Sequence, residues 1–185
     1  GFDVVAADIG LSLSKLDVRV LEARVDDIRT AMRTATREEH DALMRRMVDE
    51  RHFIGNHSHT HHPLFQMWST KRVVEDLEAT MTVISQYQHP ASKAFRPPIG
   101  IMNPNIAKAA LKLRYPIIGW NNRTFDTATK DVEVTWKRTK RNLERGKTLI
   151  LMHDTMPQSL EVTTRIVKWG REKGMEFATV EHLIS

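Results

Sequence analysis

Histidines gather in one short stretch of the sequence, residues 55–62, which reads Gly-Asn-His-Ser-His-Thr-His-His. The stretch holds four of the nine histidines and follows the apolar pair Phe53 and Ile54, which we interpret as the end of a buried strand. His57 and His61 are four positions apart, so a helical turn here would bring both imidazoles to one face, where they could share one ion. Neutral imidazole suits Zn²⁺, Co²⁺ or Ni²⁺. A catalytic zinc normally takes three protein ligands, so a third must come from elsewhere in the chain.

The composition predicts one globular domain over residues 1–185. Hydrophobic residues make up 41% of the chain and charged residues 28%, and this length is enough to bury a core. We expect a monomer without a signal peptide or a transmembrane segment, because no run approaches the ~18 apolar residues of a membrane span. The 28 basic residues are scattered among 23 acidic ones, which favours a solvated surface over a nucleic-acid interface. The lack of cysteine excludes disulfides and thiolate ligands.

Helices and short apolar strands alternate along the chain. Capping residues and apolar periodicity predict helices at about 36–50, from Ser69 or Thr70 to about 84, and at about 103–113, 132–145 and 159–173. Short apolar runs predict strands at 4–7, 94–95, 116–120, 148–152 and 175–180. Polar and titratable side chains follow several of these strands. This βα pattern is typical of a barrel or doubly wound sheet with a site at the carboxyl ends of the strands.

Four segments together resemble the polysaccharide deacetylases of the NodB homology type, the family four carbohydrate esterases. Residues 55–61 are similar to the family's metal-binding histidine motif, and residues 95–100, Phe-Arg-Pro-Pro-Ile-Gly, to its arginine loop. Residues 120–126 are similar to its tryptophan and aspartate segment, and residues 151–154, Leu-Met-His-Asp, to its closing histidine motif. All four stand in the family's order within residues 36–185. The resemblance implies an α/β fold, a distorted (β/α) barrel whose N-terminal part is either degenerate or incomplete in this chain.

The resemblance also implies hydrolysis of N-acetyl groups on a glycan that contains N-acetylglucosamine, such as peptidoglycan or chitin, in an extracytoplasmic location. His57 and His61 would bind Zn²⁺, or another divalent ion such as Co²⁺, which polarises the acetyl carbonyl and activates water. His153 would protonate the leaving amine, Asp126 would orient His153, and Arg96 would hold a catalytic aspartate. The expected substrate contacts are Pro98, Ile99, which replaces an aromatic residue of the family motif, and Trp120.

The N-terminal third departs from the family pattern. Asp8, in Ala-Ala-Asp-Ile-Gly, lies 49 positions before His57 and is the candidate catalytic base, but Ile9 stands where the family has a metal-binding aspartate. An apolar side chain cannot ligate a metal. Two hypotheses therefore stay open: a metal-dependent N-deacetylase with a third ligand from another position, and an inactive relative that binds glycan without turnover. Ordinary structural roles remain as alternatives, namely turn caps for Asp8 and Asp126, an ion pair for Arg96, core positions for Trp120 and His153, and a solvated or helix-capping histidine loop.

Overall fold

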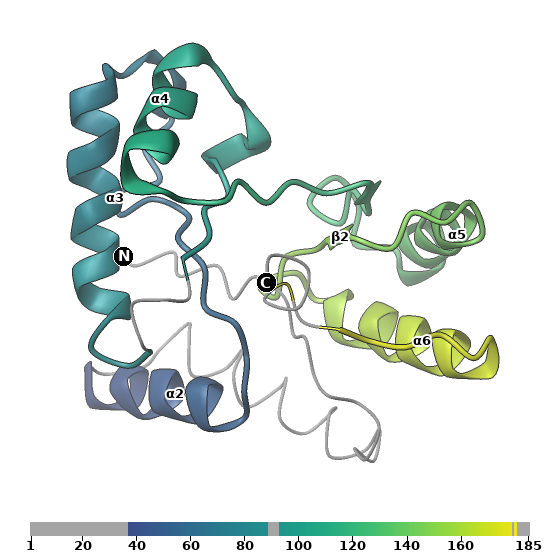
Figure 1. Cartoon of the computed structure of the whole chain (residues 1–185). Helices are drawn as coiled ribbons and strands as arrows, with labels where there is room; N and C mark the ends of the chain where they lie inside the picture. The colour runs from purple at the N-terminus through teal and green to yellow at the C-terminus, as the bar shows by residue number, and fades with distance from the viewer. Residues whose placement is uncertain (1–36, 89–92, 179, 181–185) are drawn as a thin grey trace. The chain divides into compact units, whose positions relative to one another are not determined.

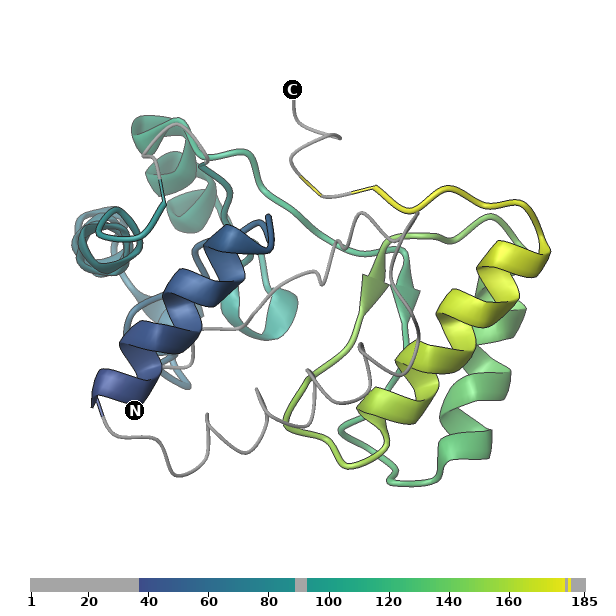
Figure 2. The same ribbon diagram turned by 90° about the horizontal axis from the view of Figure 1, so that it is seen from below.

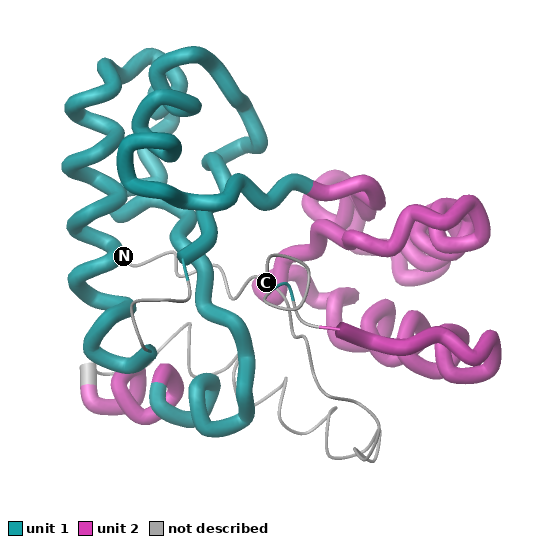
Figure 3. The backbone as a smooth tube through the Cα atoms, in the orientation of Figure 1, with its two compact units in different colours: residues 1–10, 45–119, 179–185 teal, residues 11–44, 120–178 magenta. Residues whose placement is uncertain are grey.

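The computed structural model describes residues 37–88, 93–178 and 180, within two compact units (Figure 3). Unit 1 takes in residues 1–10, 45–119 and 179–185, and unit 2 takes in residues 11–44 and 120–178. The candidate residues divide between them: His57, His61, Arg96, Pro98 and Ile99 lie in unit 1, and Trp120, Asp126 and His153 in unit 2. The predicted strand at 4–7, Asp8, Ile9 and the helix cap at residue 36 lie outside the described residues.

The predicted helices of the first half of the chain are confirmed. Helix α2 spans Arg37–Asp49, helix α3 spans Thr70–Ile84 and helix α4 spans Pro104–Leu113. The Ser69 hydroxyl accepts a hydrogen bond from the Arg72 backbone N–H, which identifies Ser69 as the cap of α3. Short 3₁₀ turns occupy Phe65–Met67 (η1) and Pro98–Gly100 (η2).

Helices α3 and α4 lie side by side in unit 1 and enclose its hydrophobic core (Figure 1). Their inward faces follow the helical spacing seen in the sequence, so apolar side chains repeat on one side of each helix. The core consists of Phe65, Trp68, Val73, Val74, Leu77, Phe95, Ile106, Ala109, Ala110 and Tyr115.

Single parallel β-bridges join the extended segments of unit 1. Asn56 pairs with Phe95, and Phe95 pairs with Ile117. The prediction of a buried strand at 116–120 is wrong, because Ile117 is 39% exposed and this segment makes only that one bridge among the described residues. Two of its carbonyl groups face the Arg96 side chain instead of a neighbouring strand, and its first residue is a proline, which has no N–H to donate.

Unit 2 contains the two-stranded parallel pair of β1 (Asn122–Arg123) and β2 (Ile150–Leu151). Helices α5 (Val132–Leu143) and α6 (Ser159–Glu172) confirm the predicted helices and lie together on one side of the pair (Figure 2). Buried side chains from both helices pack together there, with the half-buried Ile150 of β2 and Met152 just after it against them. The described helices include none that is long and apolar enough to span a bilayer.

The other predicted strands of unit 2 are shorter than expected or do not form. Strand β2 is half-buried and covers two of the residues predicted at 148–152, because the Leu149 N–H binds the Asn121 side chain. Residues 175–178 form no strand. The Met175 N–H instead donates to the Gly170 carbonyl oxygen at 2.9 Å, and Gly174 has a φ of 69°, so the chain continues the C-terminal cap of α6.

Candidate functional site

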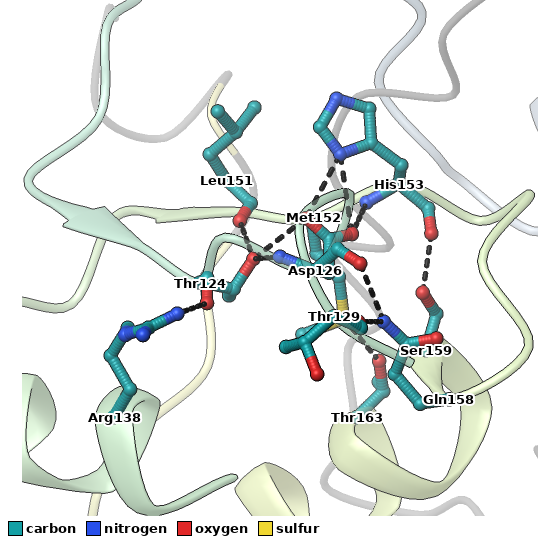
Figure 4. Close-up of polar contacts among 10 residues, drawn as sticks. All are labelled: Thr124, Asp126, Thr129, Arg138, Leu151, Met152, His153, Gln158, Ser159 and Thr163. Carbon is teal, nitrogen blue, oxygen red and sulfur yellow. Dashed lines mark hydrogen bonds and ion pairs between the residues drawn. The ribbon is translucent and has the colours of Figure 1, made fainter. Parts of the chain in front are cut away.

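Asp126 and His153 lie together in unit 2 because they follow β1 and β2, whose carboxyl ends meet at one edge of the parallel pair. The His153 Nδ1 atom is 3.0 Å from Asp126 Oδ1 and 3.2 Å from Oδ2. The backbone N–H of His153 donates to Oδ2 at 2.6 Å. The Asp126 side chain is 2% exposed and that of His153 is 37% exposed, so a buried carboxylate orients an imidazole that reaches solvent. Figure 4 shows the second ring nitrogen on the side away from Asp126.

The pKa of Asp126 is lowered from its ordinary value, and the pKa of His153 is raised from its ordinary value. Burial by itself raises the pKa of Asp126, but hydrogen bonds from the ring and backbone of His153, its positive charge and the Thr124 hydroxyl lower the pKa to below its ordinary value. The hydrogen bond to Asp126 raises the pKa of His153, although burial and the charge of Arg123 oppose it. Asp126 is therefore ionised while His153 keeps its proton to a higher pH than usual. An imidazolium held in this way suits a general acid.

Thr124 and Gln158, which the sequence analysis did not single out, hold Asp126 in place (Figure 4). The Thr124 hydroxyl lies 2.9 Å from Asp126 Oδ1 and 2.8 Å from the Leu151 carbonyl oxygen, and donates its one proton to one of them at a time. The buried Gln158 amide nitrogen donates to the carbonyl oxygens of Asp126 and Thr129, both at 2.6 Å. The position of Gln158 just before α6 is the only sequence signal for this role.

Trp120 is half-buried and belongs to the same unit as Asp126 and His153. It stands two residues before β1, which ends at Arg123. Its predicted contact with substrate stays a prediction.

The histidine stretch of unit 1 forms a loop and not a helical turn. Ser58 and His61 have φ values of 83° and 43°, in the left-handed region that interrupts a helix. The rings of His57 and His61 nevertheless come together, with centres 5.0 Å apart. The His57 Nδ1 atom is 2.7 Å from the Arg96 carbonyl oxygen. Because a carbonyl oxygen only accepts, Nδ1 donates its proton and the lone pair lies on Nε2, as in many metal-binding histidines.

Two imidazoles in this arrangement fit a divalent ion in part. Their spacing and the tautomer of His57 suit nitrogen ligation of Zn²⁺ or Co²⁺. No group of three histidine, aspartate or glutamate side chains suited to a metal occurs within residues 37–88 and 93–178. The described residues therefore offer two imidazoles, and a metal shell would need at least one further ligand. His62 has a local structural contact instead, since its Nδ1 atom accepts a hydrogen bond from the Leu64 N–H at 3.0 Å, just before η1.

Asp76 of α3 shapes the histidine loop and was not predicted to do so. Its carboxylate, 7% exposed, accepts hydrogen bonds from the His59 N–H at 2.8 Å, the Thr60 N–H at 3.2 Å and the Thr60 hydroxyl at 2.8 Å. A signal for this role exists in the sequence, because Asp76 stands within the apolar stripe of α3, three residues after Val73. A buried carboxylate in such a stripe requires polar partners.

The arginine loop lies beside the histidine loop in unit 1. Arg96 is 6% exposed, and its guanidinium faces the carbonyl oxygens of Ile118 and Gly119 at 3.4 and 3.5 Å. Pro98 is buried, whereas Ile99 is 54% exposed and has a φ of 60°, which is unusual for a β-branched residue. The predicted role of Arg96 toward Asp8 and the predicted substrate contacts of this loop stay predictions.

Comparison with known proteins identifies the family. Residues 27–118 match the family described as polysaccharide deacetylase. The chain belongs to the polysaccharide deacetylase family. The peptidoglycan-N-acetylglucosamine deacetylase PgdA of Listeria monocytogenes is 28% identical over 144 residues, 76% of this deacetylase-family chain and 29% of that protein. Chitin deacetylase 2 of Saccharomyces cerevisiae is 24% identical over 152 residues, 79% of this chain and 47% of that protein.

Solved structures share the fold of this chain. A mutant of BA3943, described as a CE4 family pseudoenzyme with restored enzymatic activity, matches with a TM-score of 0.69 and 22% identity over 92% of this chain and 64% of that chain. This likeness confirms the predicted NodB-type α/β fold class. The chain spans less than half the length of the two curated relatives named above.

Proposed function

We propose that the chain carries the site of a metal-dependent N-deacetylase that hydrolyses acetyl groups on a glycan containing N-acetylglucosamine. The observation that carries the proposal is the buried Asp126 carboxylate bound to the His153 imidazole, whose pKa it raises. Such a pair supplies the proton that a leaving amine needs in amide hydrolysis. The peptidoglycan and chitin deacetylases among its relatives support this substrate class, and with it a place of action at the cell envelope or outside the cell.

Each candidate residue has a separate role in the proposed reaction. His57 and His61 would hold a divalent ion, which when bound supplies a Lewis acid that activates water and polarises the acetyl carbonyl. His153 donates the Nε2 proton to the nitrogen of the departing sugar amine as the C–N bond breaks. Asp126 keeps Nδ1 toward itself and stabilises the imidazolium form. The predicted role of base for Asp8, held by Arg96, belongs to the same proposal, as do the substrate contacts of Pro98, Ile99 and Trp120.

The test is acetate release from N-acetylglucosamine oligomers by metal-free protein and by protein loaded with Zn²⁺ or Co²⁺. We expect release only with metal, and a fall of about 10²- to 10⁴-fold in kcat for His153→Ala, the usual contribution of a general acid. His40→Ala, an exposed histidine on α2, is the matched control and should keep full activity. No release by the wild-type chain at any metal loading would contradict the proposal, and unchanged release by His153→Ala would remove the acid from it.

The second candidate is an inactive relative that binds glycan without turnover. The absence of a complete metal-binding group among the described residues and Ile9 at the expected position of a metal-binding aspartate both favour it. The likeness to BA3943, described as a pseudoenzyme, is compatible with it. Binding to chitin or peptidoglycan without acetate release, together with a gain of metal-dependent release in Ile9→Asp, would support this candidate over the first.

A further inference from the structure

Two arginines flank an exposed phenylalanine next to Asp126. The guanidinium carbon of Arg123 lies 4.7 Å from the centre of the Phe125 ring, and that of Arg138 lies 4.9 Å from it. Arg123 belongs to β1 and Arg138 to α5, so two separate elements bring these charges to one aromatic ring. Arg138 also donates to the Thr124 carbonyl oxygen at 3.1 Å, which fixes one end of its guanidinium (Figure 4). We call Arg123, Phe125 and Arg138 the arginine–phenylalanine cluster.

The carboxylate next to this cluster in the chain, that of Asp126, is bound to His153. Neither Arg123 nor Arg138 forms an ion pair in the part of the chain that the structure describes. Arg165 of the same unit shows the contrast, since its guanidinium lies 2.6 Å from Glu133 and 2.5 Å from Glu161. Two guanidinium groups on one ring attract an anion more strongly than either alone, and their planar N–H groups match a carboxylate.

The backbone holds the Phe125 ring at the surface in an uncommon conformation. Phe125 has a φ of 56°, in the left-handed region that bulky side chains rarely adopt, and its side chain is 43% exposed. Side chains alternate here, so Asn122, Thr124 and Asp126 are buried while Arg123 and Phe125 face outward. Strained backbone conformations cluster at functional sites, and this one stands directly before Asp126, which supports a binding role for Phe125.

The cluster lies within electrostatic range of the acid. Phe125 directly precedes Asp126, whose carboxylate lies 3.0 Å from His153 Nδ1. In agreement with this proximity, the charge of Arg123 opposes protonation of His153 and so acts to lower its pKa. A sugar bound at the cluster would therefore lie next to the sugar whose N-acetyl group reacts at His153. In a polysaccharide, these two sugars would be units of one chain.

We propose that the arginine–phenylalanine cluster binds a carboxylate-bearing sugar of the glycan, beside the sugar that is deacetylated. The inference rests on the proposed function and narrows its substrate class to acidic glycans. The exposed part of the Phe125 side chain gives the sugar an apolar contact. The carboxylate of the sugar accepts N–H donors of Arg123 and Arg138. A neutral N-acetylglucosamine polymer offers the first contact and lacks the second.

The test compares the affinity of the chain for two probes of equal length, a neutral N-acetylglucosamine tetrasaccharide and a peptidoglycan tetrasaccharide with free lactyl carboxylates. We expect the wild-type chain to bind the acidic probe about tenfold more tightly at low salt, with the preference falling as ionic strength rises. The double variant Arg123→Gln and Arg138→Gln should bind both probes equally. Lys140→Gln is the matched control, because it removes one charge from α5 at a lysine 3.9 Å from Glu144, and should keep the preference.

Phe125→Asn adds a second measurement, because asparagine tolerates a positive φ and the variant removes the ring without adding strain. It should weaken binding of both probes. Equal affinity of the wild-type chain for the two probes, no binding of either, or a preference that survives in the double arginine variant would overturn the proposal.

Acetate release separates this inference from the function on which it rests. Release from both probes with equal affinity would contradict the acidic subsite and leave the deacetylase proposal intact. Tighter binding of the acidic probe without acetate release would support the subsite and assign it to an inactive glycan-binding protein.

Discussion

The Asp126–His153 pair of unit 2 and the histidine loop of unit 1 differ in whether neighbouring segments supply all the residues that each one needs. The pair is complete within the described residues, because the carboxylate, the imidazole and the donors that hold them come from two adjacent strand ends and the start of α6. The loop brings His57 and His61 together, yet the described residues offer no third ligand. A hydrogen-bonded pair needs two partners, whereas a metal shell needs a residue from a distant part of the sequence.

The two regions also stabilise their key side chains by different forces. Opposite charges hold His153, since a carboxylate that is 2% exposed faces a ring nitrogen at 3.0 Å. Backbone groups hold the histidine loop, where the Arg96 carbonyl orients His57 and the Asp76 carboxylate binds two successive N–H groups. Substitutions should therefore separate the two regions, because neither depends on the other for the contacts described.

The largest expected effect is on metal affinity. His57→Ala and His61→Ala should each weaken Zn²⁺ binding by more than about 100-fold, because each removes a ligand of the proposed metal site, and loss of an outer hydrogen bond already costs about 10- to 100-fold. Asp126→Asn should leave the affinity within about twofold, since it acts on the other region. The measurement is competition with a chelating dye, which also gives the stoichiometry.

His62→Ala is the matched control for this loop, since its ring binds the Leu64 N–H and not the ion. Equal losses in His62→Ala and His61→Ala would show a nonspecific histidine cluster. Unchanged affinity in both His57→Ala and His61→Ala would place the metal elsewhere.

Local signals in the sequence predicted the helices well. Asn103 followed by Pro104 marks the start of α4, and the Asn103 side chain indeed accepts from the Ile106 N–H at 2.9 Å. Capping is a contact between residues three apart, so the sequence contains all of it. The strand at 116–120 failed for the opposite reason: its carbonyl groups are directed to the Arg96 side chain, twenty or more positions away, and no local pattern reveals that contact.

The site shows the same division. The motifs located His153 and Asp126, and the structure brings them into contact. The residues that hold the site in place, Gln158 and Asp76, were missed. They bind backbone groups of other segments, and a backbone group is the same whatever the residue type, so the sequence does not reveal the contact. Asp76 was the easier of the two to find, because a carboxylate in an apolar helical stripe is unusual, whereas a glutamine before a helix is common.

An intermediate effect is expected from Asp76→Asn. The amide can accept fewer hydrogen bonds than the carboxylate and loses its charge, so the His59 and Thr60 backbone should loosen. We expect a loss of about 1–3 kcal/mol in the free energy of unfolding and about tenfold weaker Zn²⁺ binding. Urea unfolding and the zinc titration measure the two quantities on the same sample.

Glu75→Gln is the matched control, because it neutralises the neighbouring carboxylate on α3, which is exposed and 3.9 Å from Lys71. Its effect on stability should stay below about 0.5 kcal/mol. If Asp76→Asn lowered stability without any change in metal affinity, the loop would not depend on this brace for its histidine geometry.

The smallest expected effect is the pH dependence of stability that comes from the Asp126–His153 pair. The raised pKa of His153 means that its contribution is fully present below the ordinary value of 6.5 and is lost as pH rises through the pKa of the folded state. The lowered pKa of Asp126 means that its contribution is present above the ordinary value of 3.8 and is lost as pH falls through the pKa of the folded state. Together they stabilise the chain most between these two ordinary values.

Water weakens this attraction because the His153 side chain is 37% exposed, so the effect should be smaller than the other two. Asp126→Asn should lower the pKa of His153, read from its imidazole signals in NMR titration. It should also remove the decline in unfolding free energy that we expect of the wild-type chain as the pH rises above the ordinary value of 6.5. His40→Ala should keep that decline. An unchanged His153 pKa in Asp126→Asn would mean that the carboxylate positions the ring without stabilising its charge, and His153 would then act as an acid only at the lower pH of an ordinary histidine.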